Sequence, residues 1–98
     1  MPQRIEFHPR AADELESAYE WYRERSESAA RAFLLELDHS LDRIAEAPER
    51  YPAYESRTRR LVLPRFPFAI VYRPKDSAIE VVAVAHHKRR PGYWKARL

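Results

Sequence analysis

Apolar residues recur at every second position near the N-terminus and at every third or fourth position in the long segment that follows. Residues 3–7 alternate between polar and apolar side chains, which predicts a short β-strand with one apolar face. Over residues 9–25 apolar side chains recur every three or four positions, as in an amphipathic helix, and a proline is tolerated in its first turn. The same period returns after Ser26 or Ser28, either of which can cap a second helix, and it stops at Pro48. The very short link between the two helices predicts an antiparallel helical hairpin.

The C-terminal half has the composition of β-structure. Residues 48–57 contain two prolines and no regular period, which predicts a connecting loop. The segments that follow are rich in Leu, Val, Ile, Phe and Tyr, and they predict strands at Arg60–Leu63, Phe68–Arg73 and Ile79–Ala85. The links between them, residues 64–67 and 74–77, contain proline and form turns, so we expect an antiparallel meander. The third strand is apolar on both faces, which favours a central strand covered by the helical hairpin.

Taken in order, these elements predict an α+β fold of the type β-α-α-β-β-β in a single domain over residues 1–98. A chain of this length is the size of one small domain, and 45% hydrophobic residues is too many for intrinsic disorder. The last segment, residues 86–98, reads HHKRRPGYWKARL and is both basic and aromatic. We expect it to end in a short helical turn after its proline.

The formal net charge of +3 is divided unevenly along the chain. Residues 1–49 contain 6 basic and 12 acidic side chains, a charge of −6, whereas residues 50–98 contain 12 basic and 3 acidic side chains, a charge of +9. Such a positive half commonly binds an anionic partner, either nucleic acid or an acidic protein segment. The alternative is that the acidic half simply neutralises the basic half within one fold.

The composition excludes several kinds of chemistry. A single glycine, Gly92, cannot build a glycine-rich phosphate loop, and the absence of cysteine removes disulfides, thiol chemistry and cysteine-bound zinc. No segment approaches the roughly 20 apolar residues of a membrane span, and the N-terminus has no apolar signal segment. We therefore expect a cytoplasmic protein with no membrane association and no cofactor.

His86 and His87 are the candidates for catalysis or metal binding. Because they are sequential at the end of a strand, their side chains point to opposite faces and do not easily share a ligand. Neither cysteine nor a second histidine at helical spacing supplies the further ligands that zinc needs, so no metal site is predicted. One of the two can act as an acid or base near neutral pH, but a packed or hydrogen-bonded histidine is the simpler interpretation.

Basic residues interleaved with aromatic residues are the strongest functional signal in the chain. Such a mixture can contact phosphates through charge and stack on bases through rings. It can equally bind protein carboxylates, because arginine recognises both anions, and composition alone does not choose between them. The basic members are Arg57, Arg59, Arg60, Arg65, Arg73, Lys88, Arg89, Arg90, Lys95 and Arg97, and the aromatic members are Tyr72, Tyr93 and Trp94.

Several short motifs occur in order along nearly the whole chain. In the N-terminal half they are FHPRAADEL at residues 7–15, AYEWY at residues 18–22 and the stretch from Pro48 to Pro52. In the C-terminal half they are RRL at residues 59–61, RFPFAIVYR at residues 65–73 and the tail from Ala85 to Trp94. Together with the β-α-α-β-β-β order, these motifs resemble the RelE/ParE superfamily of bacterial type II toxin–antitoxin toxins, also labelled plasmid stabilisation proteins.

The resemblance implies a toxin that arrests growth and is held inactive by a co-expressed antitoxin, in a hetero-oligomer of the two. ParE-like members poison DNA gyrase and are not nucleases, whereas RelE-like members are ribosome-dependent mRNA endoribonucleases. The strand arginine important to the RelE branch falls at Ala69 here, and the C-terminal tyrosine of that branch falls near Trp94. Without that arginine, the charge that develops on the phosphate loses a stabiliser commonly worth on the order of 10² to 10³ in rate.

The resemblance therefore favours a ParE-like toxin that inhibits DNA gyrase by binding and is not an enzyme. Two alternatives stay open: an endoribonuclease that cuts mRNA on the ribosome, and a non-toxic module that only binds its antitoxin. The expected antitoxin is a small protein with an acidic C-terminal segment, which would complement the +9 half.

Three sets of candidate residues follow from the basic cluster and the resemblance. Contacts with the target are expected from Arg59, Arg65, Lys88, Arg89, Arg90, Tyr93, Trp94 and Lys95. Contacts with the antitoxin are expected from Trp21, Tyr22, Arg60 and Arg73. If the protein is a nuclease, the catalytic residues are expected to be Arg60, Arg73, His86, His87 and Tyr93.

Overall fold

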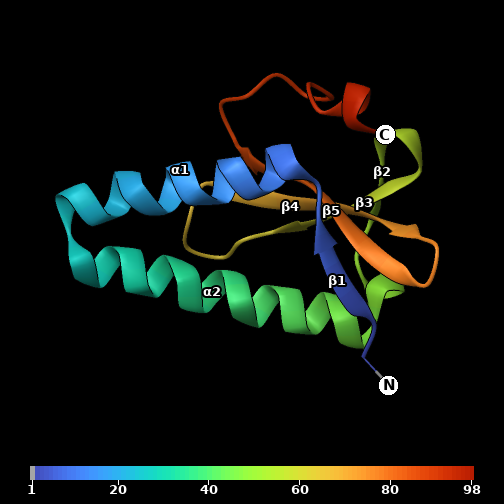
Figure 1. The fold of residues 1–98 in the computed structure, drawn as a ribbon, viewed down its shortest axis with the longest axis horizontal. Helices are drawn as coiled ribbons and strands as arrows, with labels where there is room; N and C mark the ends of the chain where they lie inside the picture. Colours follow the sequence, from blue (N-terminus) through green and yellow to red (C-terminus); the bar gives the residue numbers. More distant parts are fainter. Residues whose placement is uncertain (1) are drawn as a thin grey trace.

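The computed structural model describes residues 2–98, and Figure 1 shows the expected order of elements with one additional short strand. The strands are β1 (Arg4–Phe7), β2 (Ala53–Tyr54), β3 (Thr58–Val62), β4 (Phe68–Lys75) and β5 (Ala78–His86). The helices are α1 (Pro9–Arg25) and α2 (Glu27–Glu46). Single turns of 3-10 helix lie at Pro48–Arg50, Glu55–Arg57 and Lys95–Arg97. The α+β class and the short helical turn at the C-terminal end are confirmed.

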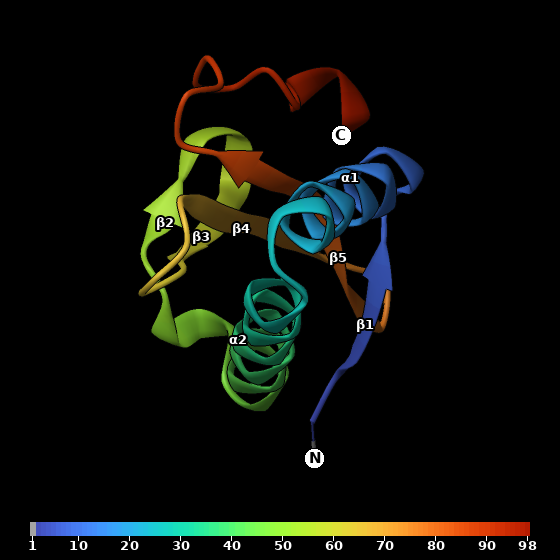
Figure 2. The ribbon, with the colours of Figure 1, turned by 90° about the vertical axis from the view of Figure 1, so that its left-hand side faces the viewer.

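The strands form one sheet in the order β1-β5-β4-β3-β2. β3, β4 and β5 pair antiparallel, which confirms the meander, whereas β1 lies parallel to β5. Figure 2 looks along the helices and shows α1 and α2 against one face of the sheet. The C-terminal segment, defined here as residues 87–98, lies over the opposite face. β5 is therefore an interior strand, as its apolar sequence predicted.

Two apolar clusters cover the two faces of the sheet. On the helical face, Phe33 and Leu37 of α2 belong to one cluster with Ile70 of β4. On the opposite face, Trp94 of the C-terminal segment belongs to a second cluster with Val71 of β4. A central strand that is buried on both sides needs apolar side chains on both, which explains why β5 shows no polar alternation.

A β-bulge between β4 and β5 widens the second cluster. Val71 pairs with Ala83 and Tyr72 pairs with Val81, so Val82 has no partner on β4. Val81 belongs to the cluster under the helices, whereas Val82 and Ala83 both belong to the cluster under the C-terminal segment. The bulge therefore places two consecutive apolar residues of β5, Val82 and Ala83, on the face that the C-terminal segment covers.

One residue links the two helices of the hairpin. The Ser26 backbone N–H donates to the Tyr22 carbonyl at 2.7 Å and closes α1, and the Ser26 Oγ accepts a hydrogen bond from the Ala29 N–H at 3.2 Å and opens α2. Ser26 therefore provides hydrogen-bond partners for a carbonyl at the end of α1 and for an N–H at the start of α2, groups that have no partner within their own helix. The N-cap is Ser26, one of the two serines that the pattern allowed.

Substitution Ser26→Ala is expected to destabilise the protein by about 1 kcal/mol, because the Ala29 N–H loses its side-chain acceptor. Urea denaturation followed by circular dichroism measures this change. The matched control is Ser28→Ala, since the hydroxyl of Ser28 bonds the Ser26 hydroxyl at 3.0 Å and caps no backbone group within residues 2–98. An equal loss in both variants would contradict the assignment of the cap to Ser26.

The prediction that residues 48–57 form only a loop is wrong. Residues Ala53 and Tyr54 pair with Arg59 and Thr58 of β3, and the chain reverses through Ser56 and Arg57, which have positive φ of 56° and 62°. A strand of two residues is too short to show alternation, so no sequence pattern revealed it.

The prediction that Pro74 lies in a turn is also wrong, because β4 continues to Lys75. The reversal uses only Asp76 and Ser77, with Asp76 at a φ of 56°. In such a hairpin, Lys75 and Ala78 flank the turn as a hydrogen-bonded pair, and hydrogen-bonded pairs alternate with pairs that are not. Pro74 then falls where its missing N–H breaks no bond to β5.

Candidate functional site

Glu14 of α1 ties the C-terminal segment to the body of the protein. Its Oε2 accepts hydrogen bonds from the Tyr93 hydroxyl at 2.7 Å and from Arg97 Nη2 at 2.9 Å. Its Oε1 accepts from Arg97 Nη1 and from the Val84 backbone N–H, each at 3.0 Å. Arg97 Nη1 also donates to the Val82 carbonyl at 2.9 Å. We call these five residues the Glu14 network.

The Glu14 network takes the place of a strand neighbour beside β5. β1 pairs with β5 only as far as Phe7 and Val81, so the part of β5 beyond that point has an open edge on this side. The Glu14 carboxylate satisfies the Val84 N–H there, and the Arg97 guanidinium satisfies the Val82 carbonyl. The position of the C-terminal segment is therefore coupled to the hydrogen bonding of the sheet.

The network holds a carboxylate and a neutral tyrosine. Burial alone would raise the pKa of Glu14, but hydrogen bonds from Arg97, Tyr93 and Val84 outweigh it and hold the pKa of this carboxyl below its ordinary value. Burial and the hydrogen bond to Glu14 raise the pKa of Tyr93 above its ordinary range. At neutral pH the Tyr93 hydroxyl is thus a donor to Glu14 rather than a base.

Trp94 anchors the same segment on the face of the sheet away from the helices. Its side chain is 1% exposed and packs in the cluster with Val71, Val82 and Ala83, and its ring lies 5.9 Å from that of Tyr54. The assignment of Trp94 as a target-contacting residue is therefore corrected: a side chain at this depth supports the segment and cannot meet a partner. The physical reason is that neither α1 nor α2 covers this face, so the tryptophan of the C-terminal segment fills it.

An open groove of about 560 Å³ lies between α1 and the C-terminal segment. Trp21 and Tyr22 of α1 and Phe68 of β4 form apolar parts of its wall, and Lys88 and Arg89 supply basic ones. Trp21 is 51% exposed, although it contacts the Tyr22 ring edge to face at a centroid distance of 5.1 Å. An exposed large aromatic side chain on an apolar wall is typical of a protein-binding surface.

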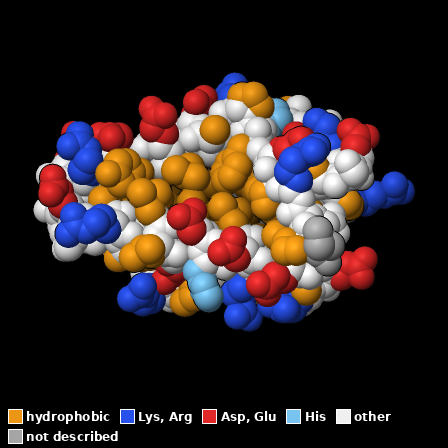
Figure 3. Space-filling view, turned by 60° about the horizontal axis from the view of Figure 1, so that its bottom comes forward, with side chains coloured by type: hydrophobic (Ala, Val, Ile, Leu, Met, Phe, Trp, Pro, Cys, Tyr) orange, Lys and Arg blue, Asp and Glu red, His pale blue; other side chains and the backbone are white. Residues whose placement is uncertain are grey.

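A second apolar surface lies on the outer side of the hairpin. Figure 3 shows apolar side chains gathered between the two helices, with acidic side chains beside them. The depression there measures about 460 Å³ and is lined by Phe7, Ala12, Leu15, Glu16, Tyr19 and Leu34. Its lining includes none of the basic cluster, so it is separate from the groove under the C-terminal segment.

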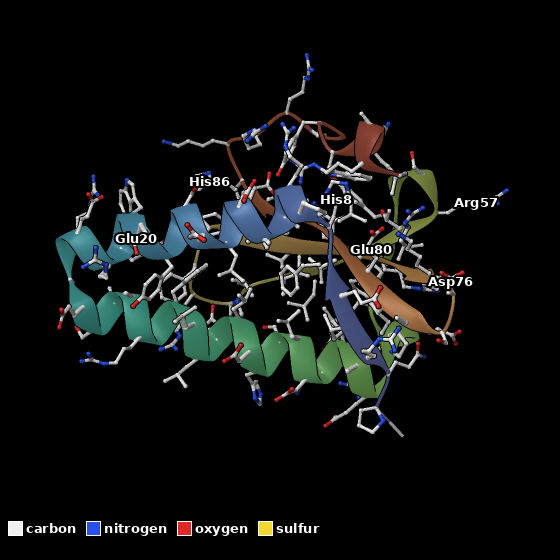
Figure 4. All side chains as sticks on the ribbon, in the orientation of Figure 1. His8, Glu20, Arg57, Asp76, Glu80 and His86 are labelled. Carbon is white, nitrogen blue, oxygen red and sulfur yellow. The ribbon has the colours of Figure 1, made fainter. Side chains whose placement is uncertain are left out.

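The two adjacent histidines have different surroundings. His86 ends β5 near α1, as Figure 4 shows, and its ring packs edge to face on Phe68 at a centroid distance of 5.0 Å. Its Nδ1 accepts a hydrogen bond from the Lys88 N–H at 3.0 Å. Burial, with the charges of Lys88 and His87, lowers the pKa of His86. His86 lines both the groove and a smaller hollow on the other side of the sheet, whereas His87 lines the hollow.

Several predicted target contacts are used within the fold. Arg65 pairs with the buried carboxylate of Glu36 at 2.9 Å, and Lys95 pairs with Glu55 at 2.8 Å. Arg59 donates to the Tyr51 carbonyl at 2.6 Å. By contrast, no ion pair within residues 2–98 involves the basic residues Lys88, Arg89 and Arg90. Among the basic residues predicted to contact the target, these three therefore keep their side-chain charge free of any ion pair or side-chain hydrogen bond within residues 2–98.

The structure does not bring the four predicted antitoxin contacts together. Trp21 and Tyr22 line the groove beside α1. Arg60 lines the hollow on the opposite face, and Arg73 pairs with Glu80 at 2.9 Å near the β4–β5 turn. One compact partner segment can cover the first pair without touching the second.

Sequence reasoning missed the role of Glu14. Its position carries a signal, because Glu14 lies three residues after Ala11 and four before Ala18, and both of these alanines are buried. A carboxylate on the buried stripe of a helix needs a partner. The partner itself could not be read from the chain, since Arg97 is 83 residues away.

Comparisons with known proteins extend this description. The family described as "ParE toxin of type II toxin-antitoxin system, parDE" matches residues 5–91. Relatives named Toxin ParE2 from two strains of Mycobacterium tuberculosis are 27% identical over 99 residues, which covers 100% of this chain and 94% of theirs. A solved structure titled "Chromosomal ParDE TA system from P. aeruginosa" matches with a TM-score of 0.74 and 18% identity, over 86% of this chain and 95% of that one.

The structural match shows that this chain shares its fold with a chain of that ParDE system. The match to the family covers most of the chain, and the chain belongs to the ParE toxin family of type II toxin–antitoxin systems. The resemblance drawn from the motifs is confirmed. Over residues 2–98, neither helix is both long and apolar enough to cross a membrane.

Proposed function

We propose that this ParE-family toxin arrests bacterial growth by binding DNA gyrase through its C-terminal segment, and that a cognate antitoxin neutralises it. The observation that carries the proposal is that Lys88, Arg89 and Arg90 make no ion pair within residues 2–98 and lie on a segment held by Trp94 and Glu14. Basic side chains on a backbone that is already fixed lose less entropy when they bind. The segment is thus preorganised to contact an anionic surface, and gyrase is the target that the ParE branch implies.

Binding rather than RNA cleavage is supported by three positions. Ala69 stands where the RelE branch carries its strand arginine, so the arginine that would stabilise the transition state of cleavage is missing from that strand. The Tyr93 hydroxyl is engaged by Glu14, and the His86 Nδ1 is engaged by the Lys88 N–H. Inhibition by binding needs no chemical step and no cofactor. Because gyrase is a cytoplasmic enzyme, a toxin that binds it acts in the cytoplasm.

The groove between α1 and the C-terminal segment is the proposed antitoxin site. Its apolar wall carries the exposed Trp21, and its rim carries Arg10, Lys88 and Arg89. This combination fits an amphipathic antitoxin segment with apolar residues on one side and carboxylates on the other. An antitoxin in this groove would lie against the basic residues of the segment and block their contact with the target.

Induction of the toxin alone is expected to stop growth with a DNA-damage reporter switched on and translation initially intact. In a supercoiling assay with purified gyrase, changing Lys88, Arg89 and Arg90 together to Gln is expected to weaken inhibition about tenfold or more, because charge-assisted contacts are lost. The matched control changes Arg4, Arg31 and Arg50 to Gln, since all three are exposed and the net charge falls equally.

Prompt loss of translation with a silent damage reporter would overturn gyrase as the target and favour mRNA cleavage. Normal growth, with antitoxin binding retained, would indicate the non-toxic binding module instead. Equal weakening of gyrase inhibition by both triple variants would mean that net charge, and not the C-terminal segment, is what gyrase recognises.

A further inference from the structure

A small basic hollow of about 90 Å³ lies on the sheet face opposite the helices, between the strands and the C-terminal segment. Ala69 of β4 and Ala85 of β5 are paired directly in register and line the bottom of this hollow. Because both side chains are single methyl groups, they leave space above the sheet. The buried ring of Trp94 forms part of its wall. The hollow is therefore a consequence of two small residues beside a large one. Its lining is Tyr54, Arg60, Ala69, Val71, Ala85, His86, His87, Arg89, Arg90, Pro91, Tyr93 and Trp94.

Aromatic rings hold two of the arginines that line the hollow. The guanidinium carbon of Arg60 lies 4.3 Å from the centre of the Tyr54 ring, and that of Arg89 lies 3.8 Å from the centre of the Tyr93 ring. Tyr93 is itself fixed by its hydrogen bond to Glu14. Stacking uses the face of a guanidinium and leaves its N–H edge free to donate. Both arginines are thus held in place with donors to spare.

Positive charge in the hollow is not compensated from within the described chain. None of its lining residues is acidic, whereas Arg60, Arg89 and Arg90 each carry a full charge. The carboxylates on the neighbouring elements are already paired, Glu55 with Lys95 and Glu80 with both Arg73 and Lys75. A concave site with one sign of charge concentrates the opposite ion more strongly than a flat surface does.

We propose that this hollow binds a single phosphate group. Arginine forks match the oxygens of a tetrahedral phosphate, and the fixed stacking of Arg60 and Arg89 reduces the entropy lost on binding. The volume admits a few water molecules or one small anion and is far below that of a pocket for a nucleoside. This inference goes beyond the proposed function, which requires only protein partners. The phosphate belongs either to a free phosphate or to a nucleic acid backbone.

NMR titration of the purified full-length protein with inorganic phosphate in 0.15 M NaCl tests the proposal. Saturable shifts are expected at residues 60, 69, 85 and 89. Arg60→Gln and Arg89→Gln are each expected to weaken binding about tenfold or more. Ala85→Val keeps every charge but fills the floor of the hollow, and it should abolish saturation. Arg31→Gln, an exposed arginine on α2, is the matched control and should bind like the unchanged protein.

A second titration with a short single-stranded oligonucleotide identifies the source of the phosphate. Shifts at the same residues, reversed by excess inorganic phosphate, assign the site to a nucleic acid backbone, whereas shifts with inorganic phosphate alone assign it to a free phosphate. No saturable shifts with either probe would overturn the proposal. Equal weakening by Arg31→Gln would also overturn it, because a general field would then explain binding. If Ala85→Val does not fold, the two arginine variants decide, and no outcome depends on gyrase.

Discussion

Substitution Glu14→Gln is expected to destabilise the protein by about 2–4 kcal/mol and to release the C-terminal segment from the sheet. The amide cannot accept from Arg97 through both oxygens, so a guanidinium with only 11% of its side chain exposed keeps its charge without its counter-ion. The Val84 N–H and the Tyr93 hydroxyl also compete for the one remaining acceptor. Urea denaturation measures the loss, and hydrogen exchange at residues 93–98 reports the release.

The contribution of Glu14 is expected to depend on pH. Its pKa in the folded protein is held below the ordinary value of 4.5, so the unfolded chain binds this proton more readily than the folded one. The stabilisation is therefore complete above pH 4.5 and is lost as the pH falls through the folded pKa. The difference in unfolding free energy between the wild type and Glu14→Gln should be largest at pH 7 and should narrow below pH 4.5.

Glu20→Gln is the control on the same helix, because Glu20 pairs with Arg23 at 2.8 Å on the surface. It should leave the denaturation midpoint and the exchange of the C-terminal segment unchanged. If Glu14→Gln were no more destabilising than Glu20→Gln, the Glu14 network would have to be a surface contact without a role in docking the segment.

The main architecture could be predicted because it depends on local patterns. The period of the apolar positions defines both helices, and serine at residue 26 or 28 gives the link between them. The strands of the meander are apolar runs bounded by prolines, so their number and direction follow from composition and link length. Local patterns failed in two places. The strand β2 has only two residues and shows no alternation, and in β4 Pro74 occupies a position where its missing N–H breaks no hydrogen bond to β5.

The candidate site was harder to predict because its contacts connect the two ends of the chain. Lys88, Arg89 and Arg90 could be selected by charge alone, since they lie in a run. The role of Tyr93 could not, because its partner Glu14 is 79 residues away. Trp94 looked like a binding residue because it follows a basic run, yet its burial depends on which face of the sheet the helices leave open. Tertiary packing determines which face the helices cover, and no local sequence pattern shows it.

The chain has two tryptophans in opposite environments, and we expect their truncation to have very different effects. Trp94→Ala is expected to cost about 3–5 kcal/mol, because it empties the space between the C-terminal segment and Val71, Val82 and Ala83. Trp21→Ala removes a side chain that is 51% exposed and should change stability by about 0.5 kcal/mol. Urea denaturation of both variants under the same conditions measures the two changes.

Tryptophan fluorescence compares the burial of Trp21 and Trp94 directly, without a measurement of unfolding free energy. With Trp21 removed, the remaining emission comes from buried Trp94 and should be blue-shifted and poorly quenched by iodide, whereas with Trp94 removed it should be red-shifted and strongly quenched. Comparable costs for the two substitutions, or strong quenching of Trp94, would mean that the C-terminal segment is not docked on the sheet in solution. The basic residues it carries would then be presented on a flexible chain, and the preorganisation on which the binding proposal depends would be lost.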